Sequence, residues 1–145
     1  MQRSGISLTP LARRCIAAGA ILMALGVMLG AFGAHVLQAQ LTPRQLASFQ
    51  TGVHYHMLHA IGLMIAGVIA QVTGPCARLR WSARLMLAGI VFFSGSIYLM
   101  TAGAPRWLGM VAPIGGMSFM GAWALLAWHA WHAWSNRQGQ DSGAT

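Results

Sequence analysis

Acidic residues are nearly absent from this chain of 145 residues, which has one, Asp141, and no lysine. Glycosidase dyads, aspartic proteases, two-metal phosphoryl transfer and carboxylate proton relays all need Asp or Glu at the site. One acid in the C-terminal tail cannot serve them, so these enzyme classes are excluded. No G-x-S-x-G elbow and no orienting acid accompany Ser94 or Ser96, which disfavours a serine hydrolase as well. We therefore expect a non-enzymatic protein.

Charge of either sign is scarce, since 7% of the residues are charged and 57% are hydrophobic, with 18 glycines. A soluble domain has about a quarter of its residues charged. This composition indicates an integral membrane protein, and the length fits a single domain over residues 1–145. The nine basic residues are all arginines that flank apolar runs. We predict that they contact anionic lipid headgroups and orient the chain, and we expect no nucleic-acid partner.

Four apolar segments are long enough to cross the membrane, for which about 20 helical residues cover a hydrocarbon core of about 30 Å. They span approximately residues 15–37, 52–72, 82–101 and 107–131. The first segment is too long for the apolar region of a signal peptide, so we interpret it as a retained helix. The sequence thus predicts an all-α bundle of four transmembrane helices. The polar residues 136–145 are expected to form a disordered tail.

The connections carry recognisable helix signals. Thr42 followed by Pro43 is typical of an N-cap and a first helical residue. We predict that a short interfacial helix lies within residues 38–50, between the first two spans. Pro113 lies inside the fourth span and lacks a backbone donor, so the first turns there should kink or begin irregularly. His129 and His132 accompany the tryptophans at the far end of this span, and we expect them to be solvated anchors in an aromatic belt.

Small residues indicate where helices approach one another. Gly26 and Gly30 have the small-xxx-small spacing that lets helix backbones pack closely, and Gly33 lies near the same face. Gly95 keeps the third span slender, and Gly115 and Gly116 add local freedom after the proline. The residues predicted to serve in packing or irregular backbone are Gly26, Gly30, Gly33, Gly95, Pro113, Gly115 and Gly116.

The arginines are distributed unevenly between the two sides of the predicted bundle. Seven lie on the side of both termini (Arg3, Arg13, Arg14, Arg78, Arg80, Arg84 and Arg137), and two, Arg44 and Arg106, lie on the other. The positive-inside rule therefore predicts that both termini are cytoplasmic. Cys15 and Cys76 then both lie near the reducing face, which argues against a structural disulfide.

The same topology places polar residues of several segments at one depth, toward the outer leaflet. Tyr55 and His59 share a helical stripe with small residues, which should face other helices. We predict a hydrogen-bonded network between helices, in which such contacts contribute about 0.6 to 2 kcal/mol each. The predicted members of this polar cluster are His35, Tyr55, His59, Ser94 and Tyr98.

Four short blocks carry a resemblance to a known family. They are GAFGAH at 30–35, YHMLHA at 55–60, FSGSIY at 93–98 and PIGG at 113–116. In this order they resemble the signature of the domain-of-unknown-function family 423, a family of small bacterial membrane proteins. The resemblance implies a four-helix protein of the bacterial inner membrane and brings no known activity. His56 stands where the family pattern has a glutamine, and His54 is not part of the pattern.

Alternatives to a hydrogen-bonded network remain. The imidazoles of His35, His56 and His59 could ligate a metal, and His35 with His59 could ligate haem. The absence of a carboxylate or cysteine at that level argues against both, so we expect no metal and no cofactor. The favoured function is packing, assembly, or binding of a lipid or membrane-protein partner, which could be a second copy of the chain. The alternative is a permeation component for a small solute, a metal or a proton.

Overall fold

The computed structural model describes the backbone of residues 7–141 and the side chains of residues 7–133. The elements are α1 (Pro10–His35), η1 (Leu37–Ala39), α2 (Pro43–Thr73), α3 (Ala77–Gly89), η2 (Ile90–Ser94), α4 (Gly95–Thr101), η3 (Arg106–Met110) and α5 (Ala112–Asp141). Four helical stretches are long and apolar enough to span a membrane: Pro10–Ala39, Pro43–Thr73, Ala77–Thr101 and Arg106–Ala133. The predicted all-α architecture with four spans is confirmed.

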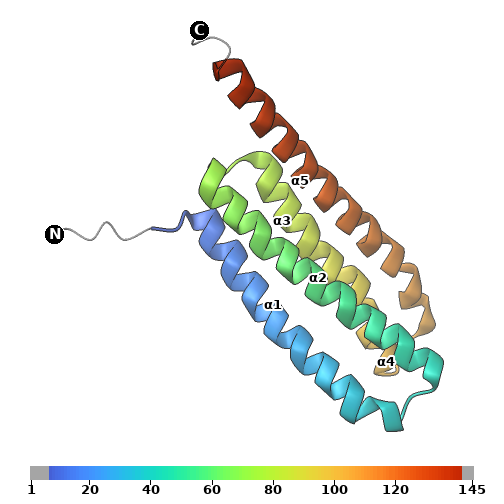
Figure 1. Ribbon diagram of the computed structural model, residues 1–145. Helices are drawn as coiled ribbons and strands as arrows, with labels where there is room; N and C mark the ends of the chain where they lie inside the picture. The colour runs from blue at the N-terminus through green and yellow to red at the C-terminus, as the bar shows by residue number, and fades with distance from the viewer. Residues whose placement is uncertain (1–6, 142–145) are drawn as a thin grey trace, which may run out of the picture.

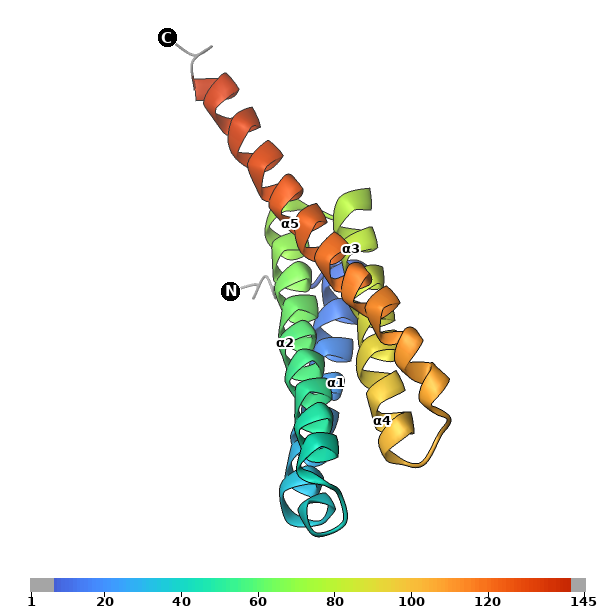
Figure 2. The same ribbon diagram turned by 90° about the vertical axis from the view of Figure 1, so that its right-hand side faces the viewer.

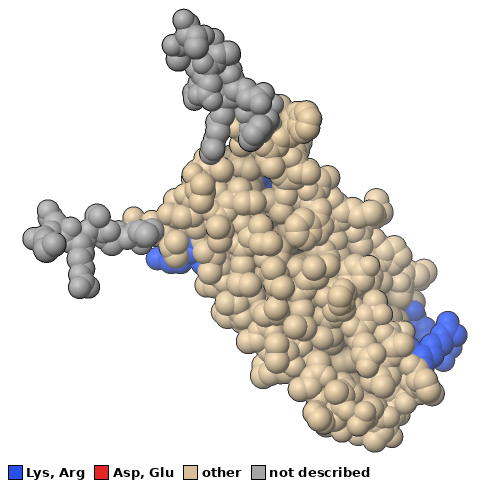
Figure 3. Space-filling model, in the orientation of Figure 1, with Lys and Arg blue, Asp and Glu red and all other residues tan. Residues whose placement is uncertain are grey.

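The bundle consists of two helix pairs joined through α2. α1 packs antiparallel along α2, and α5 packs along α3, while α2 also contacts α3, η2 and α4. Figures 1 and 2 show that α1 begins and α5 ends toward the same end of the bundle, as an even number of spans requires. On the face in Figure 3, the arginines lie toward the two ends, and no Lys, Arg, Asp or Glu is visible on the described surface between them.

The start of α2 agrees with the sequence signal, but the interfacial helix does not form. The Thr42 side chain accepts from the Gln45 amide at 3.4 Å and the Gln45 side chain accepts from the Thr42 amide at 3.0 Å, which is a capping box. From Pro43, α2 continues unbroken to Thr73. The prediction of a separate interfacial helix is therefore wrong, since only the short η1 lies between the two spans. The physical reason is that Phe49 packs into the core with Leu37, which draws the first turns of α2 into the bundle.

The contact between α1 and α2 uses small residues seven positions apart. Ala12, Gly19, Gly26 and Gly33 are buried and recur every two turns on one face of α1. A Cβ added to Gly19 would lie 2.7 Å from the Ala60 carbonyl oxygen, so the two backbones pass closely there. Gly30, predicted to pair with Gly26, is only half-buried, and a Cβ there would make an ordinary contact with Val53 at 3.5 Å. The packing repeat is thus seven residues, not four.

The third span is not a continuous α-helix, because the π-helix η2 separates α3 from α4. α5 approaches this span closely at two glycines. A Cβ added to Gly89 would collide with the Phe119 ring, and one added to Gly115 would collide with the backbone nitrogen of Phe93. Gly95 has nothing nearer than 3.9 Å, and Gly116 has nothing within 4 Å. The close approach therefore depends on Gly89 and Gly115, and neither Gly95 nor Gly116 takes part.

The fourth span begins irregularly, as Pro113 predicts. The 3-10 helix η3 precedes it, and Pro113 is the second residue of α5, where its missing donor removes no helical hydrogen bond. At the other end, α5 continues to Asp141 and so runs into the segment 136–145 that was predicted to be disordered. Residues 142–145 lie outside the described part of the chain.

Candidate functional site

A buried polar pair joins α2 to α4. The Nδ1 atom of His56 lies 3.2 Å from the hydroxyl oxygen of Tyr98. The Phe49 ring packs beside Tyr98, with ring centroids 5.3 Å apart. One turn before Tyr98, the buried Ser94 hydroxyl donates to the Gly52 carbonyl oxygen at 2.8 Å. These contacts hold the π-helix and α4 against α2 and fix the orientation of the imidazole.

The second ring nitrogen of His56 has no such partner. The side chain is 4% exposed. Nε2 is buried and makes no hydrogen bond of standard geometry with the described residues, although the Leu22 backbone of α1 lies close enough to the ring to interact with it. No other buried side-chain nitrogen or oxygen atom in the described part of the chain is in this state. An unsatisfied buried polar group costs about 1 to 3 kcal/mol, so this atom requires an explanation.

His56 and Tyr98 form the polar part of an otherwise apolar groove. The groove has a volume of about 760 Å³. It lies between α1 on one side and η2 with α4 on the other; its lining residues are Leu25, Met28, Leu29, Phe32, His56, Ile90, Val91, Gly95, Tyr98 and Leu99. Phe32, Val91 and Leu99 at its rim are exposed on the outside of the spans. The groove therefore opens sideways, toward the hydrocarbon of the bilayer.

The structure divides the predicted polar cluster between several places. Ser94 and Tyr98 lie beside the groove, but the histidine bonded to Tyr98 is His56, not His59. His35 ends α1, is exposed, and makes none of these contacts. The prediction that His35, His59 and Tyr98 share hydrogen bonds is therefore wrong.

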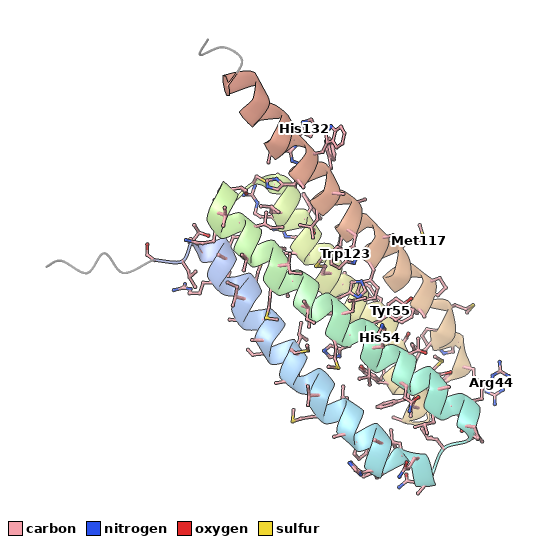
Figure 4. All side chains as sticks on the ribbon, viewed as in Figure 1. Arg44, His54, Tyr55, Met117, Trp123 and His132 are labelled. Atoms are coloured by element: carbon pink, nitrogen blue, oxygen red, sulfur yellow. The ribbon has the colours of Figure 1, made fainter. Side chains whose placement is uncertain are left out.

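His59 and Tyr55 belong to an aromatic stack between α2, η2 and α5. His59 is 2% exposed, its ring stacks on Phe119 at a centroid distance of 3.4 Å, and its Nδ1 lies 2.7 Å from the Tyr55 carbonyl oxygen. Tyr55 packs against Phe93 at 4.8 Å. Figure 4 shows Tyr55 and Trp123 along the junction of α2 with α5. This stack joins the two helix pairs of the bundle.

The replacement of His59 by alanine tests the stack. We expect His59→Ala to lower the free energy of unfolding by about 1 to 3 kcal/mol, because it removes a buried ring and its hydrogen bond. His54→Ala should have little effect, because His54 is exposed on the same helix (Figure 4). Thermal unfolding of both variants in one detergent measures the difference. Equal losses would contradict a structural role for His59.

The environment of His129 also differs from the prediction. Predicted to be a solvated anchor, it is only 7% exposed. Its Nε2 lies 3.0 Å from the Thr73 hydroxyl, and its Nδ1 lies 3.5 Å from the Cys76 sulfur. The reason is that α5 passes over the turn between α2 and α3, where those residues lie. His132, one turn later, is exposed, and its ring lies 5.9 Å from that of Trp128 (Figure 4).

No metal centre is formed by the described side chains, since no group of three or more His, Cys, Asp or Glu residues among them is placed to hold an ion. The three histidines considered as ligands are separated. His56 faces the groove, His59 faces α5, and His35 is exposed at the end of α1. The geometry of the site is instead that of a hydrogen-bonding atom at the base of an apolar groove.

Four apolar spans and a groove open to lipid define a small multi-pass membrane protein. The family model described as "Protein of unknown function (DUF423)" matches residues 29–116, and the chain belongs to this family. The matched range contains all four sequence blocks that carry the resemblance, together with His56 and Tyr98. No solved structure matches the chain significantly.

Several named membrane proteins are similar to the chain. The UPF0382 membrane protein YwdK of Bacillus subtilis is 40% identical over 108 residues, which cover 74% of this chain and 88% of that protein. The UPF0382 membrane protein SH2409 of Staphylococcus haemolyticus is 39% identical, with 74% and 87% covered. The UPF0382 inner membrane protein YgdD of Escherichia coli is 36% identical over 100 residues, with 69% and 76% covered.

Sequence reasoning missed His56, although a signal for it was present. His56 was set aside because it departs from the glutamine of the family pattern. Glutamine and histidine, however, share the ability to donate one hydrogen bond and accept another. His56 also follows Gly52 by one turn and precedes Ala60 by one turn, all three of which are buried. A polar residue on a stripe of small residues indicates a buried hydrogen-bonding position.

Proposed function

We propose that this protein is a non-enzymatic binding protein of the bacterial inner membrane, which takes a neutral lipid into the groove between α1 and η2–α4. The observation that carries the proposal is the unpartnered Nε2 of His56, buried beside an apolar groove. A ligand oxygen bonded to Nε2 would remove the cost of the unsatisfied group. The apolar walls would cover the remainder of the ligand.

The position of His56 argues for an uncharged ligand. His56 lies close to the middle of α2 (Pro43–Thr73) and hence within the hydrocarbon core, on the side of the outer leaflet because its partner Tyr98 is near the end of α4. Phospholipid headgroups lie outside that core. None of the residues that line the groove is charged. The ligand that fits is therefore a neutral lipid whose carbonyl or hydroxyl oxygen enters the hydrocarbon core, as in a quinone or an isoprenoid alcohol.

The tautomer of the His56 imidazole determines whether it binds a carbonyl or a hydroxyl oxygen of the ligand. When the Tyr98 hydroxyl donates to Nδ1, Nε2 carries the hydrogen and binds a carbonyl oxygen. In the other tautomer Nε2 accepts, and it binds a hydroxyl group. Either state needs only a hydrogen bond and apolar burial, with no acid, metal or second base. This is why binding fits the site better than catalysis.

The arginines support the proposed placement in the membrane. The guanidinium of Arg78 lies over the Trp128 ring at 5.6 Å, and that of Arg84 lies over the Trp81 ring at 5.0 Å. Arginine paired with tryptophan suits the interface between lipid tails and headgroups. We infer that this end of the bundle contacts anionic headgroups and faces the cytoplasm. Arg44 extends outward at the opposite end (Figure 4).

The proposal is tested by ligand binding in lipid nanodiscs, with decylubiquinone as the carbonyl probe and farnesol as the hydroxyl probe. We expect saturable binding of one of them and at least about tenfold weaker binding by His56→Phe, which removes the nitrogens. His54→Phe, the control, should bind like the wild type. Gly95→Phe should also abolish binding without unfolding the bundle, because its ring enters the open groove. Unchanged binding in both His56→Phe and Gly95→Phe would refute the site, as would no saturable binding of either probe.

A further inference from the structure

Three polar side chains meet at the turn between α2 and α3, at the end of the bundle away from η1. They are Thr73 from the last turn of α2, Cys76 just before α3, and His129 from α5. The sulfur of Cys76 lies 3.5 Å from Nδ1 of His129, whose Nε2 lies 3.0 Å from the Thr73 hydroxyl oxygen. None of these residues lines the groove described above.

The Ile69 carbonyl oxygen determines which atom donates in the two contacts of His129, because a carbonyl oxygen can only accept. The Thr73 hydroxyl donates its single proton to the Ile69 carbonyl oxygen at 2.9 Å. In the contact with His129, the Thr73 oxygen must therefore accept, and Nε2 must carry the hydrogen. A neutral imidazole protonated at Nε2 has its lone pair on Nδ1, which faces Cys76. The thiol consequently donates to Nδ1, and His129 is oriented as a base toward the sulfur.

The surroundings of Cys76 combine the apolar core with the first turn of α3. Cys76 is the N-cap residue of α3, a helix of 13 residues, and its side chain makes no capping hydrogen bond with the first amides. The guanidinium of Arg78 lies over the ring of Trp128, the residue before His129. Cys76 is half-buried and also packs against the apolar core. The sulfur thus lies between the hydrocarbon interior and an arginine-bearing surface.

We propose that Cys76 is an S-acylation site, which accepts a long-chain acyl group from an acyl thioester. Cys76 gives its proton to Nδ1 of His129, and the sulfur attacks the carbonyl carbon of the donor. A new carbon–sulfur bond forms, the donor's carbon–sulfur bond breaks, and the departing thiolate takes the proton from His129. The exchange needs no oxidant or reductant.

An acyl thioester matches both sides of this site. Its acyl chain partitions into the apolar layer of the membrane, while a phosphorylated carrier such as coenzyme A is attracted to Arg78 and Arg80. After transfer, the chain attached to Cys76 would lie in the hydrocarbon beside the bundle. Cys15 provides a contrast within the same molecule, because it is 5% exposed in the core and no hydrogen bond to a histidine is found for it.

The test uses the full chain in nanodiscs, incubated with palmitoyl-coenzyme A at neutral pH and followed by intact mass. We expect one hydroxylamine-labile palmitoyl adduct, located on Cys76 by peptide mass spectrometry. Cys76→Ala should abolish it, and Cys15→Ala should not. His129→Gln should slow acylation at least about tenfold, since general-base assistance contributes about 10² or more.

Thr73→Val is the matched variant that keeps the volume but removes the hydroxyl that orients His129. Thr73→Val should slow acylation by a smaller factor than His129→Gln. If His129→Gln unfolds, the acylation rate of Thr73→Val is the test of whether His129 assists the reaction. An adduct on Cys15, no adduct at all, or an unchanged rate in Thr73→Val and in a folded His129→Gln would overturn the proposal. So would an equal rate in SDS-unfolded protein, because the reactivity would then not depend on the fold.

Discussion

Gly115→Ala is expected to lower the free energy of unfolding by about 3 kcal/mol, the upper part of the usual range for overpacking. The added Cβ would collide with the backbone nitrogen of Phe93 and lie 2.8 Å from its Cα. Backbone atoms in the π-helix cannot rotate away as a flexible side chain can. Relief therefore requires α5 to separate from η2, which also disturbs the stack of Phe119 on His59.

The neighbouring Gly116 provides the control for this measurement. A Cβ there meets nothing within 4 Å, and alanine favours a helix over glycine by about 1 kcal/mol. Gly116→Ala should therefore be neutral or stabilising. Chemical or thermal unfolding of both variants in one detergent measures the contrast. Similar stabilities of the two variants would show that α5 and η2 do not approach as closely as described.

Reporter fusions should give an all-or-none result on the orientation of the chain. Seven arginines against two predict that both termini are cytoplasmic. Alkaline phosphatase fused after Thr145 should then be inactive, whereas phosphatase inserted between Gln40 and Thr42 should be active. This insertion site is the short connection between η1 and α2, so it avoids both spans. Activity from the terminal fusion, together with none from the insertion, would show the opposite orientation. It would then contradict the prediction made from the distribution of the arginines.

Local features of the fold could be predicted from the sequence. Hydropathy and length gave the four spans because a chain that crosses the hydrocarbon core must satisfy its backbone groups internally, as an apolar helix of about 20 residues does. Thr42 with Pro43 predicted a helix start, which belongs to α2 and not to a separate interfacial helix. Pro113 predicted an irregular start of the last span. The helix starts depend on neighbours within one helical turn, and the spans depend on about 20 consecutive residues. None of them requires knowledge of which helices touch.

The pairing of polar residues could not be predicted in the same way. His56 and His59 are three residues apart and both buried, so only the positions of α1, α4 and α5 decide which of them meets Tyr98. His129 is buried because Thr73 and Cys76 are brought beneath α5. The prediction of an interfacial helix was wrong for the same reason. The contact of Phe49 with Leu37 is a tertiary contact, which the local sequence does not reveal.

The π-helix η2 has a consequence for how the length of the chain can vary. A π-turn holds one residue more than an α-helical turn, because its hydrogen bonds run from residue i to i+5 instead of i+4. η2 therefore takes up one extra residue while Tyr98 keeps its facing toward His56. Loss of one residue between Ile90 and Ser94, with closure into a regular α-helix, should leave Tyr98 on the same side of the span. Relatives that keep the groove should therefore differ by no more than this one residue between Gly89 and Tyr98. Longer insertions and deletions should lie in the connections between spans, where they do not rotate a helix.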